Sequence, residues 1–258
     1  MRMKKTLIFF LFNLIVSTLC LGEIIDKGFK GRINFNQVGL SNWQKGGDET
    51  TSLFSKVNGH INQAIFKGQL STQLQIRYGI TKTGEEEFIK SDDEIRINSD
   101  YIINSNNKIK PYASFLVLTQ LAEGKDYKMT PATKVSDFLD PAYLTESIGA
   151  QYQYNQNNRK LTNRFGAALK QTIVRNAIIT QDKSEAGLEF VSIYEDIFLK
   201  KVTLKSTFQV FNGFHKIKNT DIYWDTDLAL RLHTNIHLSF ILNLIYDTDI
   251  QPNDKSKK

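Results

Sequence analysis

The chain of 258 residues carries 33 Lys and Arg against 27 Asp and Glu, is 41% hydrophobic and contains one cysteine. This composition excludes collagen-like and charge-driven disordered chains. A single cysteine also excludes an internal disulfide framework and a cysteine-rich metal site.

Residues 1–22 have the composition of a signal peptide. Three basic residues precede an apolar run that reaches Leu21, and Gly22 supplies a small residue for cleavage. We predict that this segment is removed and that 23–258 forms one exported domain. The alternatives are an uncleaved anchor, for which the run is short, and a lipoprotein signal at Cys20.

Cleavage nearly balances the charge of the chain. Without 1–22 the protein keeps 30 basic and 27 acidic residues, and the excess equals three lysines at the extreme C-terminus, Lys255, Lys257 and Lys258. A net charge of this size does not indicate nucleic acid. We therefore predict no nucleic-acid partner.

From residue 23 onward, apolar and polar residues alternate with a period of two, which predicts β-strands. Within Leu70–Ile80, for example, one face reads Leu, Thr, Leu, Ile, Tyr, Ile and the other Ser, Gln, Gln, Arg, Gly. No stretch shows a competing helical period, so the chain is predicted to be all-β. The predicted strands lie near residues 29–40, 53–65, 70–80, 94–103, 109–120, 142–154, 161–173, 184–194, 202–212, 222–232 and 236–246.

Two all-β architectures fit this alternation. A soluble sandwich or lipocalin-like barrel turns its apolar faces inward, whereas an outer-membrane barrel turns them towards lipid. The predicted strands approach the length of tilted spanning strands, while soluble strands average about five or six residues. Aromatic residues also recur near strand ends, where interfacial girdles lie. We therefore favour the membrane barrel.

The links between strands alternate between short and long. Short polar links fall near 67–68, 105–108, 155–160, 196–201 and 233–235, and longer ones near 41–51, 82–93, 121–141, 174–183 and 213–220. Tight periplasmic turns and longer external loops have this asymmetry. We predict an antiparallel up-and-down transmembrane β-barrel of 11–12 strands.

The strand count raises a question about closure. Eleven strands is an odd number, whereas bacterial single-chain barrels have an even one, and the tail from Asp247 onward is too polar to span. We expect the final, closing strand to be missing from this chain.

Two motifs carry a family resemblance. The run Asn42-Trp43-Gln44-Lys45-Gly46-Gly47 follows the first predicted strand, and Asp137–Ser147 lies in the middle of the chain. Both resemble segments of the DUF3078 family of Bacteroidetes outer-membrane proteins, over most of the mature chain. The resemblance implies an outer-membrane β-barrel and brings no established activity.

The loop of this motif, Trp43 with Gly46 and Gly47, has two interpretations. It could bind a ligand, but we expect the glycines to supply turn positions with positive φ and the tryptophan to anchor at the membrane interface.

Charged residues on the polar faces form the second candidate site. In an outer-membrane barrel they would line the lumen, either as salt bridges or as the wall of a selective, porin-like pore. The candidate lumen-lining residues are Arg77, Glu94, Arg96, Asp100, Asp225, Asp227 and Arg231.

The sequence offers little for catalysis. Among the four histidines, His233 and His237 are separated by a predicted turn. Ser239 is close to His237 in sequence, but closeness in sequence is no evidence of the geometry that a catalytic Ser–His pair needs. We predict no catalytic, cofactor-binding or metal-binding residues, no cofactor and no enzyme activity.

The predicted function is structural or pore-forming, with passage of small solutes through the cell outer membrane. The expected partners are outer-membrane lipid and the barrel-assembly machinery. The alternative is a protein whose external loops bind a surface ligand or serve adhesion, and an embedded hydrolase ranks third.

Overall fold

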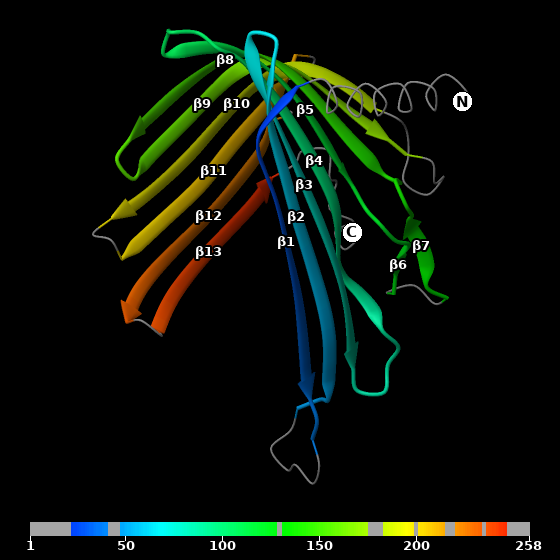
Figure 1. Ribbon diagram of the computed structural model, residues 1–258. Coiled ribbons are helices and arrows are strands. Elements are labelled where there is room, and N and C mark those ends of the chain that lie inside the picture. Colours follow the sequence, from blue (N-terminus) through cyan, green and yellow to red (C-terminus); the bar gives the residue numbers. More distant parts are fainter. Residues whose placement is uncertain are drawn as a thin grey trace. The chain divides into compact units, whose positions relative to one another are not determined.

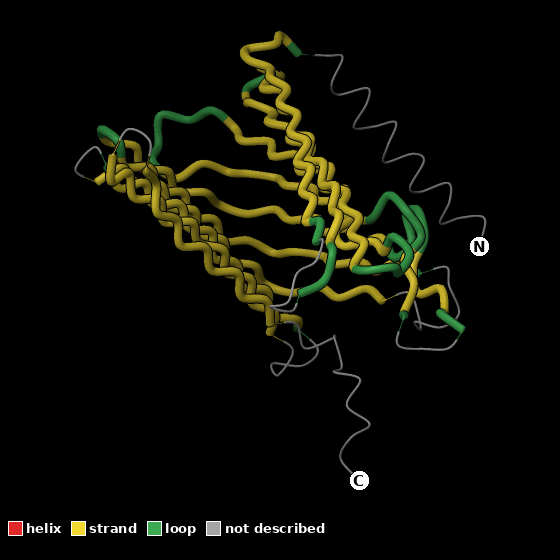
Figure 2. Tube along the Cα trace, turned by 90° about the horizontal axis from the view of Figure 1, so that it is seen from below, coloured by secondary structure: helices red, strands yellow, loops and turns green. Residues whose placement is uncertain are grey.

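A computed structural model describes residues 22–40, 47–127, 131–174, 183–198, 201–214, 220–233 and 236–246. In this part of the chain every regular element is a β-strand (Figure 2). No helix among these residues is long and apolar enough to cross a membrane.

All eleven predicted strands are present (Figure 1). Most are longer than predicted, and β1 begins at Glu23 rather than near Phe29. Two short strands, β6 and β7, were not predicted. The bounds are β1 Glu23–Val38, β2 Thr50–Ile65, β3 Gly68–Thr83, β4 Ile89–Ile103, β5 Ile109–Thr119, β6 Gly124–Asp126, β7 Thr133–Ser136, β8 Ala142–Gln156, β9 Arg159–Ile173, β10 Lys183–Phe198, β11 Val202–Gly213, β12 Thr220–His233 and β13 Ile236–Tyr246.

The chain divides into two compact units. The first comprises residues 1–102, 115–144 and 172–182, and the second comprises 103–114, 145–171 and 183–258. Strands follow the order β1-β2-β3-β4-β5 in the first unit and β5-β8-β9-β10-β11-β12-β13 in the second, so β5 contributes to both. The β6–β7 pair forms a separate two-stranded sheet in the first unit.

Consecutive strands pair in antiparallel register. The β2–β3 ladder runs from Thr50 opposite Thr83 to Ile65 opposite Gly68, where Phe66 and Lys67 form the turn. The β10–β11, β11–β12 and β12–β13 ladders follow the same pattern. The predicted all-β, antiparallel, up-and-down fold is confirmed.

One link is shorter than predicted. Residues 81–83 continue to pair with β2, so the link from β3 to β4 covers 84–88 instead of 82–93. It therefore has the same length as the turn 104–108 between β4 and β5, and the alternation of short and long links is less strict than the sequence suggested.

The longest link, between β5 and β8, is folded rather than irregular. The Asp93 carboxylate of β4 accepts the backbone N–H groups of Leu121 at 2.7 Å and Ala122 at 3.0 Å, and Lys90 Nζ donates to it at 2.7 Å. The side chain of Asp93 is only 3% exposed. A buried carboxylate with three donors fixes the start of the link, and the β6–β7 hairpin follows it.

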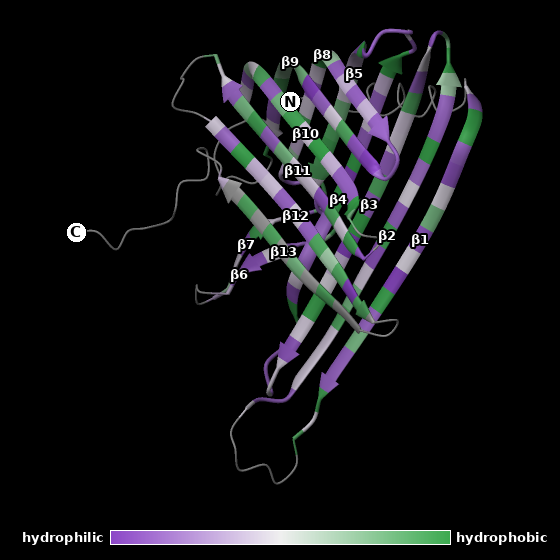
Figure 3. Ribbon diagram, turned by 90° about the vertical axis from the view of Figure 1, so that its left-hand side faces the viewer, coloured by the Kyte–Doolittle hydropathy of each residue, from purple (hydrophilic) through white to green (hydrophobic). Residues whose placement is uncertain are grey.

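Burial in this sheet is inverted relative to a soluble protein. Glutamines are the largest fully buried side chains, Gln63 and Gln151 at 1% exposure each, whereas Phe29, Ile148 and Phe165 are 77%, 66% and 57% exposed. Among the described residues ten polar or charged side chains are buried, against six hydrophobic ones. Figure 3 shows the hydrophilic and hydrophobic residues alternating along the strands. On β8 the period-two pattern therefore buries the polar residues Ser147 and Gln151 and exposes Ile148, whereas Gln63 lies on the apolar face of β2 with Val57.

Candidate functional site

The polar face of the sheet is the candidate site, and the strand register defines it. Residues directly opposite each other on paired strands point to the same face. In the first unit Lys56 lies opposite Arg77, and Asn58 lies opposite Gln75. Polar residues of β2 and β3 thus share one face, while Val57 and Ile76 share the other.

An ion-pair cluster occupies this face on β3 and β4, made of Arg77, Asp92, Glu94 and Arg96. Glu94 is its centre, because it accepts Arg77 Nη2 at 3.1 Å, Arg96 Nε at 3.5 Å and the amide of Gln75 at 3.0 Å. Asp92 lies 3.6 Å from the same Arg77 nitrogen. These side chains are 17–35% exposed, so the cluster is only partly screened by water.

The register also aligns positive charges across three strands of the first unit. Arg32 of β1 lies opposite Lys56 of β2, which lies opposite Arg77 of β3. Like charges in directly opposed positions repel each other. Among the described residues Arg77 alone of the three forms an ion pair, so this row keeps an excess of positive charge.

Asp100 lies further along β4 and is buried, with a hydrogen bond from Asn98 Nδ2 at 3.0 Å. The structure thus brings three of the predicted lumen-lining residues, Arg77, Glu94 and Arg96, into one cluster. Asp100 belongs to a separate hydrogen-bonded group on the same strand.

The other predicted residues lie on β12, in the second unit. Asp225 lies opposite Thr207, and Asp227 lies opposite Lys205, an exposed lysine that also lies 3.7 Å from Glu195. Arg231 is exposed, and its backbone N–H donates to the Lys201 carbonyl in the β10–β11 turn. These three side chains do not form a cluster like that of β3 and β4.

Two interactions that were not predicted complete the polar face of the second unit. Lys170 of β9 pairs with Asp221 of β12 and lies 4.8 Å from the centre of the Phe211 ring. Buried Glu189 accepts the Gln209 amide at 2.7 Å. Each buried charge therefore has a polar partner, as a low-dielectric face requires.

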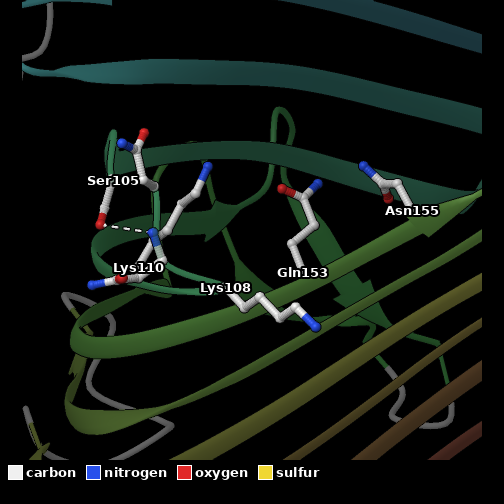
Figure 4. Close-up of a pocket in the computed structure, with 7 residues that line it drawn as sticks. Ser105, Lys108, Lys110, Gln153 and Asn155 are labelled. Atoms are coloured by element: carbon white, nitrogen blue, oxygen red, sulfur yellow. Dashed lines mark hydrogen bonds between the residues drawn. The ribbon is translucent and has the colours of Figure 1, made fainter.

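A hollow of about 260 Å³ lies at the end of this polar face in the second unit (Figure 4). The turn between β4 and β5 and the end of β8 surround it, and Asn107 N–H donates to Ser105 Oγ at 3.1 Å within the turn. Every lining residue is polar, two are lysines, and none is acidic. The lining residues are Ser105, Asn106, Asn107, Lys108, Lys110, Gln153 and Asn155.

The strand alternation did not predict this hollow, although the sequence carries a signal for it. Residues 101–122 contain no Asp or Glu, and neither do residues 147–181. These stretches include β5, β9 and most of β8, which are neighbours in the sheet. Two adjacent acid-free stretches could have indicated a positively charged patch.

The family-motif loop lies mostly beyond what the structure describes. Trp43 and Gly46 fall outside the described residues. Gly47 has a φ of +114°, a conformation that L side chains rarely adopt. The turn role predicted for Gly47 thus agrees with its backbone.

Histidine chemistry is limited in the described part of the chain. His60 Nε2 lies 2.9 Å from Asp26 Oδ2 in an exposed pair. The described residues contain no group of three or more His, Cys, Asp or Glu side chains placed to hold a metal ion. The side chains of His233 and His237 lie outside the described residues.

The ion pair of Lys134 and Asp137, outside the main sheet, has shifted pKa values. Lys134 Nζ donates to Asp137 at 2.6 Å, and the Phe138 N–H donates to the same carboxylate at 2.8 Å. These hydrogen bonds lower the pKa of Asp137 and raise that of Lys134. Both residues belong to the folded link between β5 and β8.

The fold and its polar face define an antiparallel β-sheet protein in which, among the described residues, more polar or charged side chains are buried than hydrophobic ones, ten against six. Comparison with protein families is consistent with the sequence motifs. The model of DUF3078, a protein family of unknown function, matches residues 35–124, which include the Trp43 motif. The model of DUF481, also of unknown function, matches residues 141–258.

The predicted resemblance to DUF3078 is confirmed, and its extent is narrower than expected. It covers β2 to β5 and the end of β1, whereas most of the central segment 137–147 falls within the DUF481 match. A comparison with curated proteins gives no match.

Proposed function

We propose that this chain is an outer-membrane β-barrel protein whose polar face lines a lumen for small solutes. The observation that carries the proposal is the inverted burial of β8 and β9 in the second unit: Ser147 and Gln151 are buried, while Ile148 and Phe165 are exposed. In water this arrangement would leave the exposed apolar side chains without the stabilisation that their burial provides. In a bilayer the same exposed residues meet hydrocarbon.

Strand length supports the same environment. The eleven strands of the main sheet have 11 to 16 residues each. A tilted strand needs about 9–11 residues to cross the hydrocarbon core, so each is long enough to span. Each strand from β2 to β12 in the main sheet has a neighbour on both sides, so its backbone groups can pair within the sheet, as hydrocarbon demands. Among the described strands, β1 and β13 have one neighbour each.

A barrel protein of this kind requires export through the signal peptide 1–22, insertion by the barrel-assembly machinery, and surrounding outer-membrane lipid. We propose a non-enzymatic role. The polar face offers ion pairs and amides suited to guiding solutes, and Glu94 in particular is saturated by Arg77, Arg96 and Gln75.

A binding role for the loops is the second candidate. The link between β5 and β8 is held by the buried Asp93 carboxylate and contains its own β-hairpin, β6–β7. A folded surface loop presents a fixed shape, which a ligand-binding loop needs.

Two measurements test the proposal. The protein expressed with its signal peptide should be recovered in the outer-membrane fraction and should migrate faster in gels before heating than after it. Recovery as a soluble periplasmic protein without detergent contradicts the proposal. In planar bilayers the purified protein should give stepwise conductance. Electrical silence together with loop-dependent ligand binding favours the second candidate.

A further inference from the structure

We infer that the hollow between the β4–β5 turn and β8 is a binding site for a small organic anion with two or more carboxylate or phosphate groups. The inference rests on the proposed function, because it names the class of solute that the polar face would attract. Figure 4 shows the hollow with Lys108, Lys110, Gln153 and Asn155 around it.

The charge of the hollow is uncompensated. Lys108 ends the β4–β5 turn and Lys110 lies at the start of β5, and Figure 4 shows their side chains running in different directions along the hollow. Neither lysine forms an ion pair among the described residues, and no lining residue is acidic. A bound anion would supply the opposite charge that both ammonium groups lack.

The remaining lining supplies hydrogen-bonding groups without charge. Gln153 and Asn155 are also two residues apart, on the neighbouring strand β8, and two further asparagines come from the turn. Amide N–H groups donate to carboxylate and phosphate oxygens. Lysine and amide donors together therefore fit an oxyanion, whereas a cation would meet two like charges.

The positive charge continues beyond the hollow along the polar face. Arg164 of β9 lies 5.5 Å from the centre of the Tyr112 ring and donates through Nε to Gln151 Oε1 at 2.9 Å. Both Tyr112 and Gln151 are buried.

The size of the hollow limits the ligand. Its volume of about 260 Å³ lies just below the range of about 300–1,000 Å³ typical of pockets for drug-sized molecules. A di- or tricarboxylate or a small phosphate ester fits this limit. Two lysines in the lining favour a molecule that bears two anionic groups.

The test is titration calorimetry on full-length mature protein refolded in detergent, with citrate as the multivalent probe and acetate as the monovalent one. Citrate should bind more tightly than acetate. The double variant Lys108→Gln/Lys110→Gln should weaken citrate binding about tenfold, because it removes two solvent-exposed charge pairs with the anion. The affinity should also fall as KCl is raised.

Lys67→Gln is the matched control, since it removes an exposed lysine from another short turn, that between β2 and β3. It should leave citrate binding unchanged. Heat-modifiable migration checks that each variant is folded. Equal citrate affinity in the double variant and the control, or citrate binding no tighter than acetate binding, overturns the inference.

Planar bilayers separate this inference from the pore proposal. If the protein conducts, the double variant should shift the reversal potential in a KCl gradient towards cation preference. Lysine-dependent citrate binding without conductance would retain the site and reject the pore. Conductance with lysine-independent citrate binding would retain the pore and reject the site.

Discussion

Two stretches of the polar face differ in whether their positively charged side chains have acidic partners. On β3 and β4, Arg77 and Arg96 each reach the Glu94 carboxylate, and Asp92 lies beside Arg77. At the ends of β5 and β8, Lys108 and Lys110 line a hollow without any acidic residue. Both stretches belong to strands with the same period-two alternation.

This difference shows that the position of a polar residue along a strand and the sign of its charge are two separate requirements on the sequence. Alternation decides which side chains lie on the apolar face of a strand and which lie on its polar face, and any hydrophilic residue suits the polar face. The sign of the charge is then free to vary. Paired charges rigidify β3 and β4, whereas unpaired lysines leave a site that an anion can complete.

The largest expected effect tests the alternation that both stretches share. Leu74→Arg should strongly reduce the folded, membrane-inserted fraction, because an arginine facing hydrocarbon near the midplane costs about 2–4 kcal/mol. Gln75→Arg places the same side chain on the polar face beside Glu94 and should be tolerated. Heat-modifiable protein in isolated membranes is the measurement. Equal losses for the two variants would mean that the assignment of faces is wrong.

A smaller effect is expected when the paired stretch is made to resemble the unpaired one. Glu94→Gln removes the carboxylate shared by Arg77 and Arg96, so unfolding in urea should become easier by about 1–3 kcal/mol, the cost of losing charge-assisted hydrogen bonds. Glu87→Gln, in the exposed link 84–88, is the control and should unfold like the wild type. If the two variants unfold alike, Glu94 does not organise the cluster.

The reverse change makes the unpaired stretch resemble the paired one. Gln153→Glu adds a carboxylate to the hollow, where it can pair with Lys108 or Lys110. Stability should change by no more than about 0.5 kcal/mol, as for other surface substitutions, while calorimetric citrate binding is lost. Gln73→Glu adds the same charge to β3 and should preserve binding. A similar loss in both variants would indicate a general charge effect.

The smallest effect concerns the link between β5 and β8, which lies outside both stretches. Lys134 and the Phe138 N–H lower the pKa of Asp137 below its ordinary value of 3.8. The carboxylate therefore stabilises the folded link fully above that value, and the contribution is lost as the pH falls through the lowered pKa. Hydrogen exchange at Phe138, corrected for its intrinsic rate, should lose protection only in that acidic range.

Lys134→Met removes the strongest hydrogen-bond donor to Asp137 and should move this loss of protection to higher pH. An unchanged profile in the variant would show that the ion pair does not hold the link.

The sequence alone determined the strands and their faces. Leu70–Ile80 was assigned to a strand from its own residues, and it lies inside β3. This succeeds because side-chain direction alternates within a strand whatever its neighbours are. The same local rule located each strand of the main sheet. It failed for β6 and β7, which have three and four residues and too few positions to show a period.

Only the tertiary structure decided which polar residues meet. Arg77 and Glu94 belong to different strands, and a register slip of one residue would place one of them on the opposite face. Lys110 and Gln153 are brought together because β5 and β8 become neighbours across a link that folds separately. Composition marked this patch as acid-free, but the hollow itself exists only once strand pairing fixes the positions of its lysines and amides.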